Sequence, residues 1–132
     1  MFRLHIIKYQ NTIFYPVKEI LQIPYYELTK VEAIVKIYIN NILFFSDDYF
    51  PILEFIYQFE QWKNSQINTD FEYNSIEAVE NPIISFHLRS GKCIFNSIWK
   101  LTSELLSVEL SEVIEEINSC KIELLTMINT KK

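Results

Sequence analysis

Glycine is almost absent from this chain of 132 residues, in which Gly91 is the single example. A phosphate-binding loop needs several glycines so that its backbone can approach the phosphate, so P-loop and dinucleotide-binding sites are excluded and we expect no cofactor. Cysteine is scarce too, because only Cys93 and Cys120 are present, far apart and without a CxxC or Cys/His spacing. This pattern predicts two buried, reduced thiols and no metal site.

Long hydrophobic runs are also missing. Asn, Asp, Glu or Lys interrupt the apolar stretches well before the ~20 residues that a membrane-spanning helix needs. The opening segment MFRLHIIKYQ alternates in polarity and lacks the small-residue cleavage site of a signal peptide. We therefore expect a cytoplasmic protein without a membrane-spanning segment.

Basic residues are outnumbered, with 12 Lys and Arg against 17 Asp and Glu and a net charge of −5. Direct nucleic-acid binding is not expected, because it needs clustered Lys and Arg that neutralise phosphates. Hydrophobic residues make up 49% of the chain and aromatic residues 15%, enough to fill a core. The length predicts one domain over residues 1–132, and the charge favours a basic partner.

Two hairpins are predicted by alternating polarity and turn residues. Residues 2–9 and 31–39 alternate with the period of strands, and Asn40-Asn41 tolerates the positive φ angles of a tight turn before a short return strand. Residues 84–89 and 92–97 predict a second hairpin around Ser90-Gly91. Residues 70–78 predict one more strand.

Two helices are predicted where apolar residues recur at helical spacing, over Phe50–Lys63 and over Val108–Met127. Asp47 or Asp48 is expected to cap the first helix, and Ser107 the second. Each helix has one apolar stripe and the strands alternate, so helices and strands need each other to bury their apolar sides. The predicted fold class is α+β, a mostly antiparallel twisted sheet with the two principal helices packed on one face.

His87 is the side chain best suited to catalysis in this sequence. On the predicted hairpin it shares a face with Ser85 and Asn96, so a small enzyme or ligand-binding protein would line a pocket with these three residues. A general base also needs a nucleophile and an orienting carboxylate, and the sequence assembles neither beside His87. We therefore expect a protein that is not an enzyme and has no catalytic, cofactor-binding or metal-binding residues.

A family resemblance extends from Val31 to Ile117. The segments IYINNILFFSDDYFPILEFIYQFEQW and FEYNSIEAVENPIISFHLRSGKCIFNSIWKL, followed by an acidic helix, resemble small bacterial immunity proteins encoded beside polymorphic or contact-dependent growth inhibition toxins. Many such proteins are single α+β domains with a strand, an I-N-G turn and a meander that ends in SIW, although Asn41 stands where they often have glycine. The resemblance implies a cytoplasmic, antitoxin-like protein that binds a cognate protein toxin and occludes its active site.

The predicted toxin-binding surface is acidic and aromatic. Many toxin domains act on nucleic acids and are basic, so a basic nuclease fits as the partner, and opposite charges accelerate association by ~10–1000-fold at low salt. A loop that enters a helix exposes carboxylates beside a large ring, and polar positions on the helix and on a neighbouring strand extend this surface. The candidate partner-binding residues are Asp47, Asp48, Tyr49, Glu54, Gln58, Gln61, Glu72 and Glu77. The alternative is a non-catalytic protein–protein interaction module with a different partner.

Overall fold

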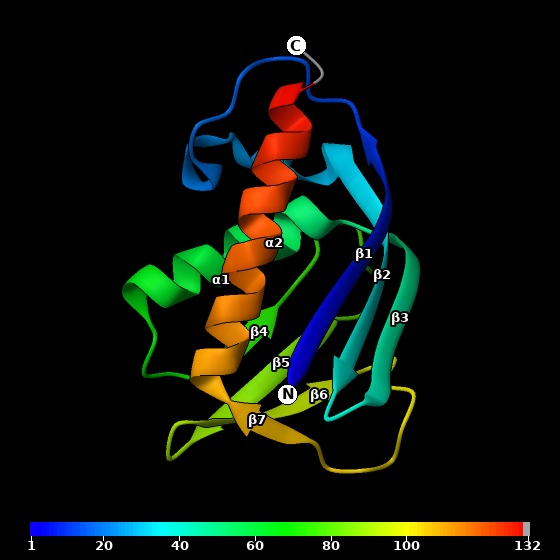
Figure 1. The fold of residues 1–132 in the computed structure, drawn as a ribbon, viewed down its shortest axis with the longest axis vertical. Helices are drawn as coiled ribbons and strands as arrows, with labels where there is room; N and C mark the ends of the chain where they lie inside the picture. Colours follow the sequence, from blue (N-terminus) through cyan, green and yellow to red (C-terminus); the bar gives the residue numbers. More distant parts are fainter. Residues whose placement is uncertain (131–132) are drawn as a thin grey trace.

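The computed structural model describes residues 1–130, in which seven strands and two long helices surround a buried hydrophobic core (Figure 1). In chain order the elements are β1 (Phe2–Asn11), η1 (Ile20–Gln22), η2 (Tyr25–Lys30), β2 (Val31–Ile39), β3 (Ile42–Phe50), α1 (Ile52–Ser65), β4 (Phe71–Tyr73), β5 (Ile84–Arg89), β6 (Lys92–Ser97), β7 (Ser107–Glu109) and α2 (Leu110–Thr130). An antiparallel three-stranded sheet has the order β1-β2-β3, and an antiparallel four-stranded sheet has the order β4-β5-β6-β7. The α+β class is confirmed, but the strands form two sheets rather than one.

Both predicted hairpins are present, and their turns use positive φ angles. Asn40 and Asn41 have φ angles of 51° and 68° between β2 and β3, a conformation that asparagine tolerates better than most residues. Gly91, between β5 and β6, has a φ of 78°, which costs little without a Cβ atom. The second hairpin pairs Phe86 with Phe95, and both rings are buried as the alternation predicts.

The start of α1 differs from the prediction. β3 is not a short return strand, because its pairing with β2 continues as far as Ala33 opposite Phe50. Asp47 and Asp48 therefore lie within a strand, and neither caps the helix, whose N-cap position is Pro51 without a side-chain hydrogen bond. Pairing with β2, the other strand of the same hairpin, has overridden the local capping preference of these aspartates.

Two further element boundaries, at Ser107 and after Tyr73, also differ from the sequence prediction. Ser107 does not cap α2 but begins β7, where it pairs with Ile94 of β6. The strand predicted at residues 70–78 is shorter, and as β4 it ends at Tyr73. Beyond Tyr73 the chain leaves the sheet as a loop that returns at Ile83, whose N–H donates to the Tyr73 carbonyl at 2.9 Å.

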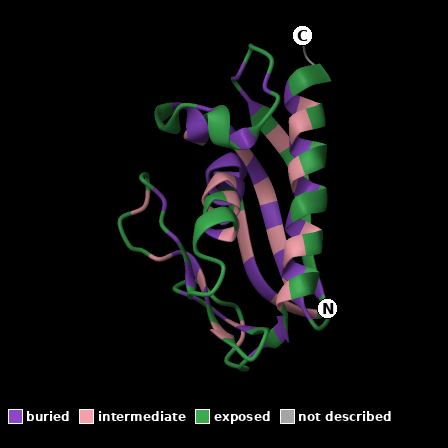
Figure 2. Cartoon of the chain, turned by 90° about the vertical axis from the view of Figure 1, so that its left-hand side faces the viewer, coloured by how far each residue is buried: buried purple, intermediate pink, exposed green. Residues whose placement is uncertain are grey.

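Helix α2 runs alongside β1 and buries one side along its length (Figures 1 and 2). β1 is an edge strand, and at Leu4 its outward backbone groups are bonded to the helix. The Leu4 N–H donates to the Glu116 carboxylate at 2.8 Å, and the Cys120 thiol donates to the Leu4 carbonyl at 3.7 Å. This cover blocks the pairing of another strand at that point. Among the described helices, none is both long and apolar enough to cross a membrane.

The two cysteines are buried free thiols, as predicted. Burial, followed by the charge of Glu109, raises the pKa of Cys93 to about 12. Burial also raises the pKa of Cys120 to about 12, with a smaller contribution from Glu116 and Glu123. Both groups therefore stay neutral near neutral pH and pack as small apolar side chains.

Glu60 ties the two long helices together. Its carboxylate lies 2.7 Å from the ammonium group of Lys63 on α1 and 2.9 Å from that of Lys121 on α2, and its side chain is 12% exposed. Burial favours the neutral acid, but the hydrogen bonds and charges of the two lysines outweigh burial and hold the pKa of Glu60 below its ordinary value. The carboxylate is therefore ionised in the folded protein and stabilises the contact between the helices.

We expect Glu60→Gln to lower the free energy of unfolding by ~1–3 kcal/mol near neutral pH, because two partly buried ammonium groups lose their counter-charge. A carboxylate with a depressed folded pKa stabilises the protein above its unfolded pKa, and this contribution is lost as the pH falls through the folded pKa. The difference between wild type and variant should therefore shrink as the pH falls below the ordinary pKa of a glutamate, as urea denaturation at neutral and at acidic pH will show. As a control, Glu115→Gln removes an exposed carboxylate of α2 and should change stability by less than ~0.5 kcal/mol. An equal loss in both variants would contradict the role given to Glu60.

Candidate functional site

The structure brings together parts of the predicted partner-binding set, on two separate surfaces. Gln58, Gln61 and Glu72 line a groove between α1 and β4. Asp48 and Tyr49 line a smaller hollow on the three-stranded sheet. The sequence predicts one continuous patch around the start of α1, whereas the structure distributes these residues over two surfaces.

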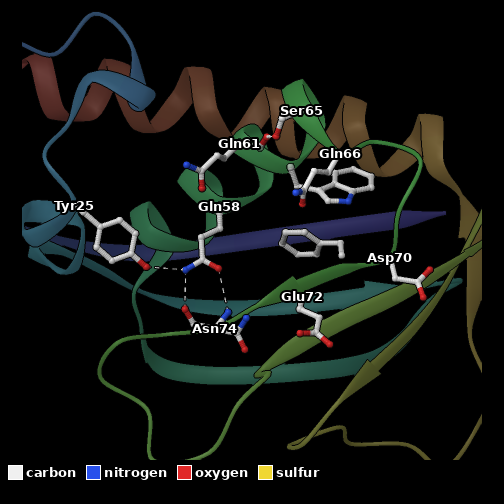
Figure 3. A pocket seen from close by; sticks show the side chains of 10 residues that line it. Tyr25, Gln58, Gln61, Ser65, Gln66, Asp70, Glu72 and Asn74 are labelled. Carbon is white, nitrogen blue, oxygen red and sulfur yellow. Dashed lines mark hydrogen bonds between the residues drawn. The ribbon is translucent and has the colours of Figure 1, made fainter.

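The groove between α1 and β4 has a volume of about 650 Å³ (Figure 3). Helix α1 and the residues just after it supply one wall, the segment around β4 supplies the other, and η2 supplies one residue. The lining residues are Tyr25, Gln58, Gln61, Trp62, Ser65, Gln66, Asp70, Phe71, Glu72 and Asn74. Amide, hydroxyl and carboxylate groups predominate, and the largely buried rings of Trp62 and Phe71 supply the apolar part.

Gln58 fixes the shape of the groove at the end near η2 (Figure 3). Its amide nitrogen donates to the Asn74 carbonyl at 2.6 Å and to the Tyr25 hydroxyl at 3.2 Å, and its amide oxygen accepts the Asn74 N–H at 3.0 Å. Asn74 follows the last residue of β4, so this side chain satisfies backbone groups that leave the strand ladder there. Gln58 is therefore a structural part of the wall and only partly available to a partner.

The groove carries negative charge from Asp70 and Glu72, and none of its lining residues is Lys, Arg or His. Asp70 is held by the four-stranded sheet, because its carboxylate accepts hydrogen bonds from the His87 ring and the Leu88 N–H, both at 2.8 Å, and lies 3.5 Å from the Arg89 guanidinium. The His87 hydrogen bond, followed by the Leu88 N–H, lowers the pKa of Asp70. Asp70 is therefore ionised at neutral pH and fixed in position.

The contact of Asp70 with His87 supplies the orienting carboxylate that a general base at His87 would need. The His87 side chain is nevertheless 59% exposed and is not among the residues that line the groove. Ser85 and Asn96 lie opposite each other on β5 and β6, beside His87 on the same face of the sheet. The three side chains named for an enzyme therefore occupy a solvated sheet face, and the groove lies to one side of them.

The second surface lies where β2 and β3 meet, at a hollow of about 220 Å³. Asp48, Tyr49 and Glu32 are among its lining residues, together with Lys8 from β1, and the Tyr49 side chain is 71% exposed. Asp47 does not line it and accepts the backbone N–H of Tyr49 at 3.1 Å. This hollow combines two carboxylates, one lysine and an exposed tyrosine, and it lies on strands rather than at a helix start.

Glu54 is wrongly placed on the exposed face of α1 by the sequence prediction. It is 0% exposed, and its carboxylate accepts the Tyr73 hydroxyl at 2.7 Å and the Ile76 N–H at 3.2 Å. The charge of Glu54 follows burial among the causes that raise the pKa of Tyr73, so the phenol stays protonated and donates. Glu54 therefore anchors the loop after β4 and has no exposed surface to offer a partner.

Glu77 lies on the loop between β4 and β5 rather than on a strand. Its pKa is raised by partial burial and then by the charges of Glu32 and Glu54. Glu32 lines the hollow on the three-stranded sheet, but Glu77 is not among its lining residues.

A family model described as "Domain of unknown function (DUF7878)" matches residues 4–130. The chain belongs to the DUF7878 family. No curated protein and no solved structure matches it. The matched segment of this DUF7878 chain includes the residues of the groove and of the hollow and both long helices.

In this DUF7878 chain, sequence reasoning missed the contact between Asp70 and His87. The antiparallel register pairs Phe71 with Phe86, which brings the preceding residue 70 next to residue 87. Both strands were predicted, so the missing information was that β4 is the neighbour of β5 and in which register. With that pairing assumed, the aspartate just before β4 would have been placed beside His87.

Proposed function

We propose that this protein is a cytoplasmic, immunity-type protein that binds a cognate bacterial toxin and neutralises it by occluding its active site. The observation that carries the proposal is the groove between α1 and β4, which has two carboxylates and no basic residue in its lining. Such a groove suits the Lys and Arg side chains of a basic protein such as a nuclease. The resemblance to immunity proteins indicates that this basic protein is a toxin.

Charge supports both the rate and the selectivity of such binding. The chain has a net charge of −5, and the hollow with Asp48 and Glu32 adds negative charge to that of the groove. Complementary charge raises the association rate and disfavours acidic partners. Tyr25 at the groove and Tyr49 at the hollow are 42% and 71% exposed, and tyrosine is enriched among the residues that dominate binding energy.

Three charge reversals of equal size test the proposal. We expect Glu72→Lys in the groove to raise the dissociation constant for the toxin by ~10–100-fold, and Asp48→Lys in the hollow to raise it by ~3–30-fold. Glu104→Lys, at an exposed position of the loop between β6 and β7, should change it by less than ~3-fold. Titration calorimetry with the product of the adjacent reading frame measures the three constants.

Each outcome of this titration decides one point. Weakening by Glu72→Lys but not by Glu104→Lys supports the groove as the interface. Equal affinity in all three variants shows that the interface lies elsewhere on the chain. Failure of the wild-type chain to bind the adjacent product contradicts the immunity proposal, and binding of a non-toxic product supports the alternative of a general interaction module.

A further inference from the structure

The loop between β4 and β5 displays apolar side chains that the fold does not use. Val79 is fully exposed, at 102% of its reference area, and Ile76 is 59% exposed. Glu77 and Glu80 are exposed beside them. Exposed apolar side chains are common singly, but here two of them share one short loop with two carboxylates.

Hydrogen bonds across its base hold the loop in one shape. The Ser75 N–H donates to the Asn81 side-chain oxygen at 3.0 Å, and the Asn81 side-chain amide donates to the Ser75 carbonyl at 3.1 Å. The Ile83 N–H closes the base by donating to the Tyr73 carbonyl at 2.9 Å. The loop is therefore ordered by its own contacts before any partner arrives.

A buried carboxylate adds a second anchor. Glu54 reaches from α1 into the core and accepts the N–H of Ile76, the first of the two exposed apolar residues. Burial of a carboxylate is costly unless hydrogen bonds compensate for it, and Glu54 accepts such bonds from the loop and from Tyr73. A loop fixed in this way loses little conformational entropy when it binds, which favours affinity.

The loop also begins at the acidic groove. Asn74, at its start, lines the groove between α1 and β4. Glu77, three residues later, lies close enough to Glu32 of the hollow for its pKa to be raised by that charge, after the effect of burial. A partner that covers the groove therefore meets the start of this loop.

We infer that this loop is the central contact with the partner, and that Val79 inserts into an apolar pocket whose rim carries Lys or Arg side chains facing Glu77 and Glu80. The inference rests on the proposed function, because the partner is the toxin of that proposal. An apolar side chain in a pocket, surrounded by charged pairs that exclude water, is the usual organisation of a strong binding contact. Ile76 packs beside the same pocket.

The test compares two exposed apolar residues on different loops. Val79→Ser should weaken binding of the adjacent reading frame's product by ~10–100-fold, because the apolar area buried in the pocket is lost. Leu105→Ser, at a residue that is 80% exposed on the loop between β6 and β7, should change affinity by less than ~3-fold. Both variants should keep the denaturation midpoint of the wild type, which shows that each is folded.

The outcomes separate this inference from the proposed function. Equal affinity of the wild type and Val79→Ser overturns the role of the loop and leaves the proposed function standing. Equal weakening by Val79→Ser and Leu105→Ser also overturns it, because the effect would then not belong to this loop. Absence of binding by the wild type overturns both the inference and the proposed function. If the wild type forms a dimer and Val79→Ser dissociates it, the loop binds a second copy of this chain rather than a toxin, which overturns the inference.

Discussion

Phe55→Ala is expected to lower the free energy of unfolding by ~3–5 kcal/mol, because it removes a buried ring and leaves a cavity. Phe55 is 2% exposed and lies in a cluster of aromatic rings, with centroid distances of 5.5 Å to Phe50, 5.3 Å to Tyr73 and 6.2 Å to Phe71. These contacts join α1 to β3 and to β4, so the cavity would open where the two sheets meet. A loss of this size is a large share of the ~5–15 kcal/mol that stabilises a typical domain.

Chemical denaturation measures this effect. Phe14→Ala is the matched control, because the same ring is removed at a position that is 73% exposed. The control should change stability by less than ~0.5 kcal/mol. An unchanged midpoint for Phe55→Ala would show that the core does not lie between α1 and the sheets.

Glu54→Ala is expected to lower the free energy of unfolding by ~2–4 kcal/mol, because the Tyr73 hydroxyl and the Ile76 N–H each lose the carboxylate oxygen that accepts from them. Glu54→Gln keeps one acceptor oxygen, so its cost should be smaller, at ~1–2 kcal/mol. In both variants the Ile76 amide should exchange its hydrogen faster than in the wild type, because one anchor of the loop is weakened. Denaturation and hydrogen exchange together separate loss of stability from loosening of the loop.

Glu115→Ala serves as the control for Glu54, since it removes an exposed carboxylate from the other long helix. Its stability should stay within ~0.5 kcal/mol of the wild type. If Glu54→Ala behaved like the control, the carboxylate would not be buried or bonded as described.

Features set by neighbouring residues were predictable from the sequence. The turns at Asn40-Asn41 and at Gly91 were found because positive φ angles restrict which residues can occupy them. The alternation in β2 and the apolar stripe of α1 were found because their periods follow from strand and helix geometry. These local signals were sufficient for the α+β class.

Features set by the pairing of strands were not predictable in this way. The division into two sheets, the length of β3 and the existence of β7 depend on which strand lies beside which. Asp47 and Asp48 illustrate the consequence, because both are good helix caps by residue type and both were drawn into β3 by its pairing.

The candidate site shows the same limit. The sequence predicts that Gln61 and Glu72 are exposed polar residues of the binding surface, and in the structure both line one groove. The same residue pattern predicts an exposed Glu54, but its carboxylate faces inward because the loop after β4 supplies a donor for it. The sequence does not predict the position of Asp70 at the groove, because its carboxylate is held by His87 across the pairing of β4 with β5.

Survival of cells that produce the adjacent gene's product is the measurement that tests the proposed neutralisation most directly. Cells are induced to make this product alone, with the wild-type chain, or with its Glu72→Lys variant, and colonies are counted. We predict that the product alone stops growth, that the wild-type chain restores it, and that the variant protects less although it is folded. Death of the cells despite abundant, folded wild-type chain would contradict the proposed function.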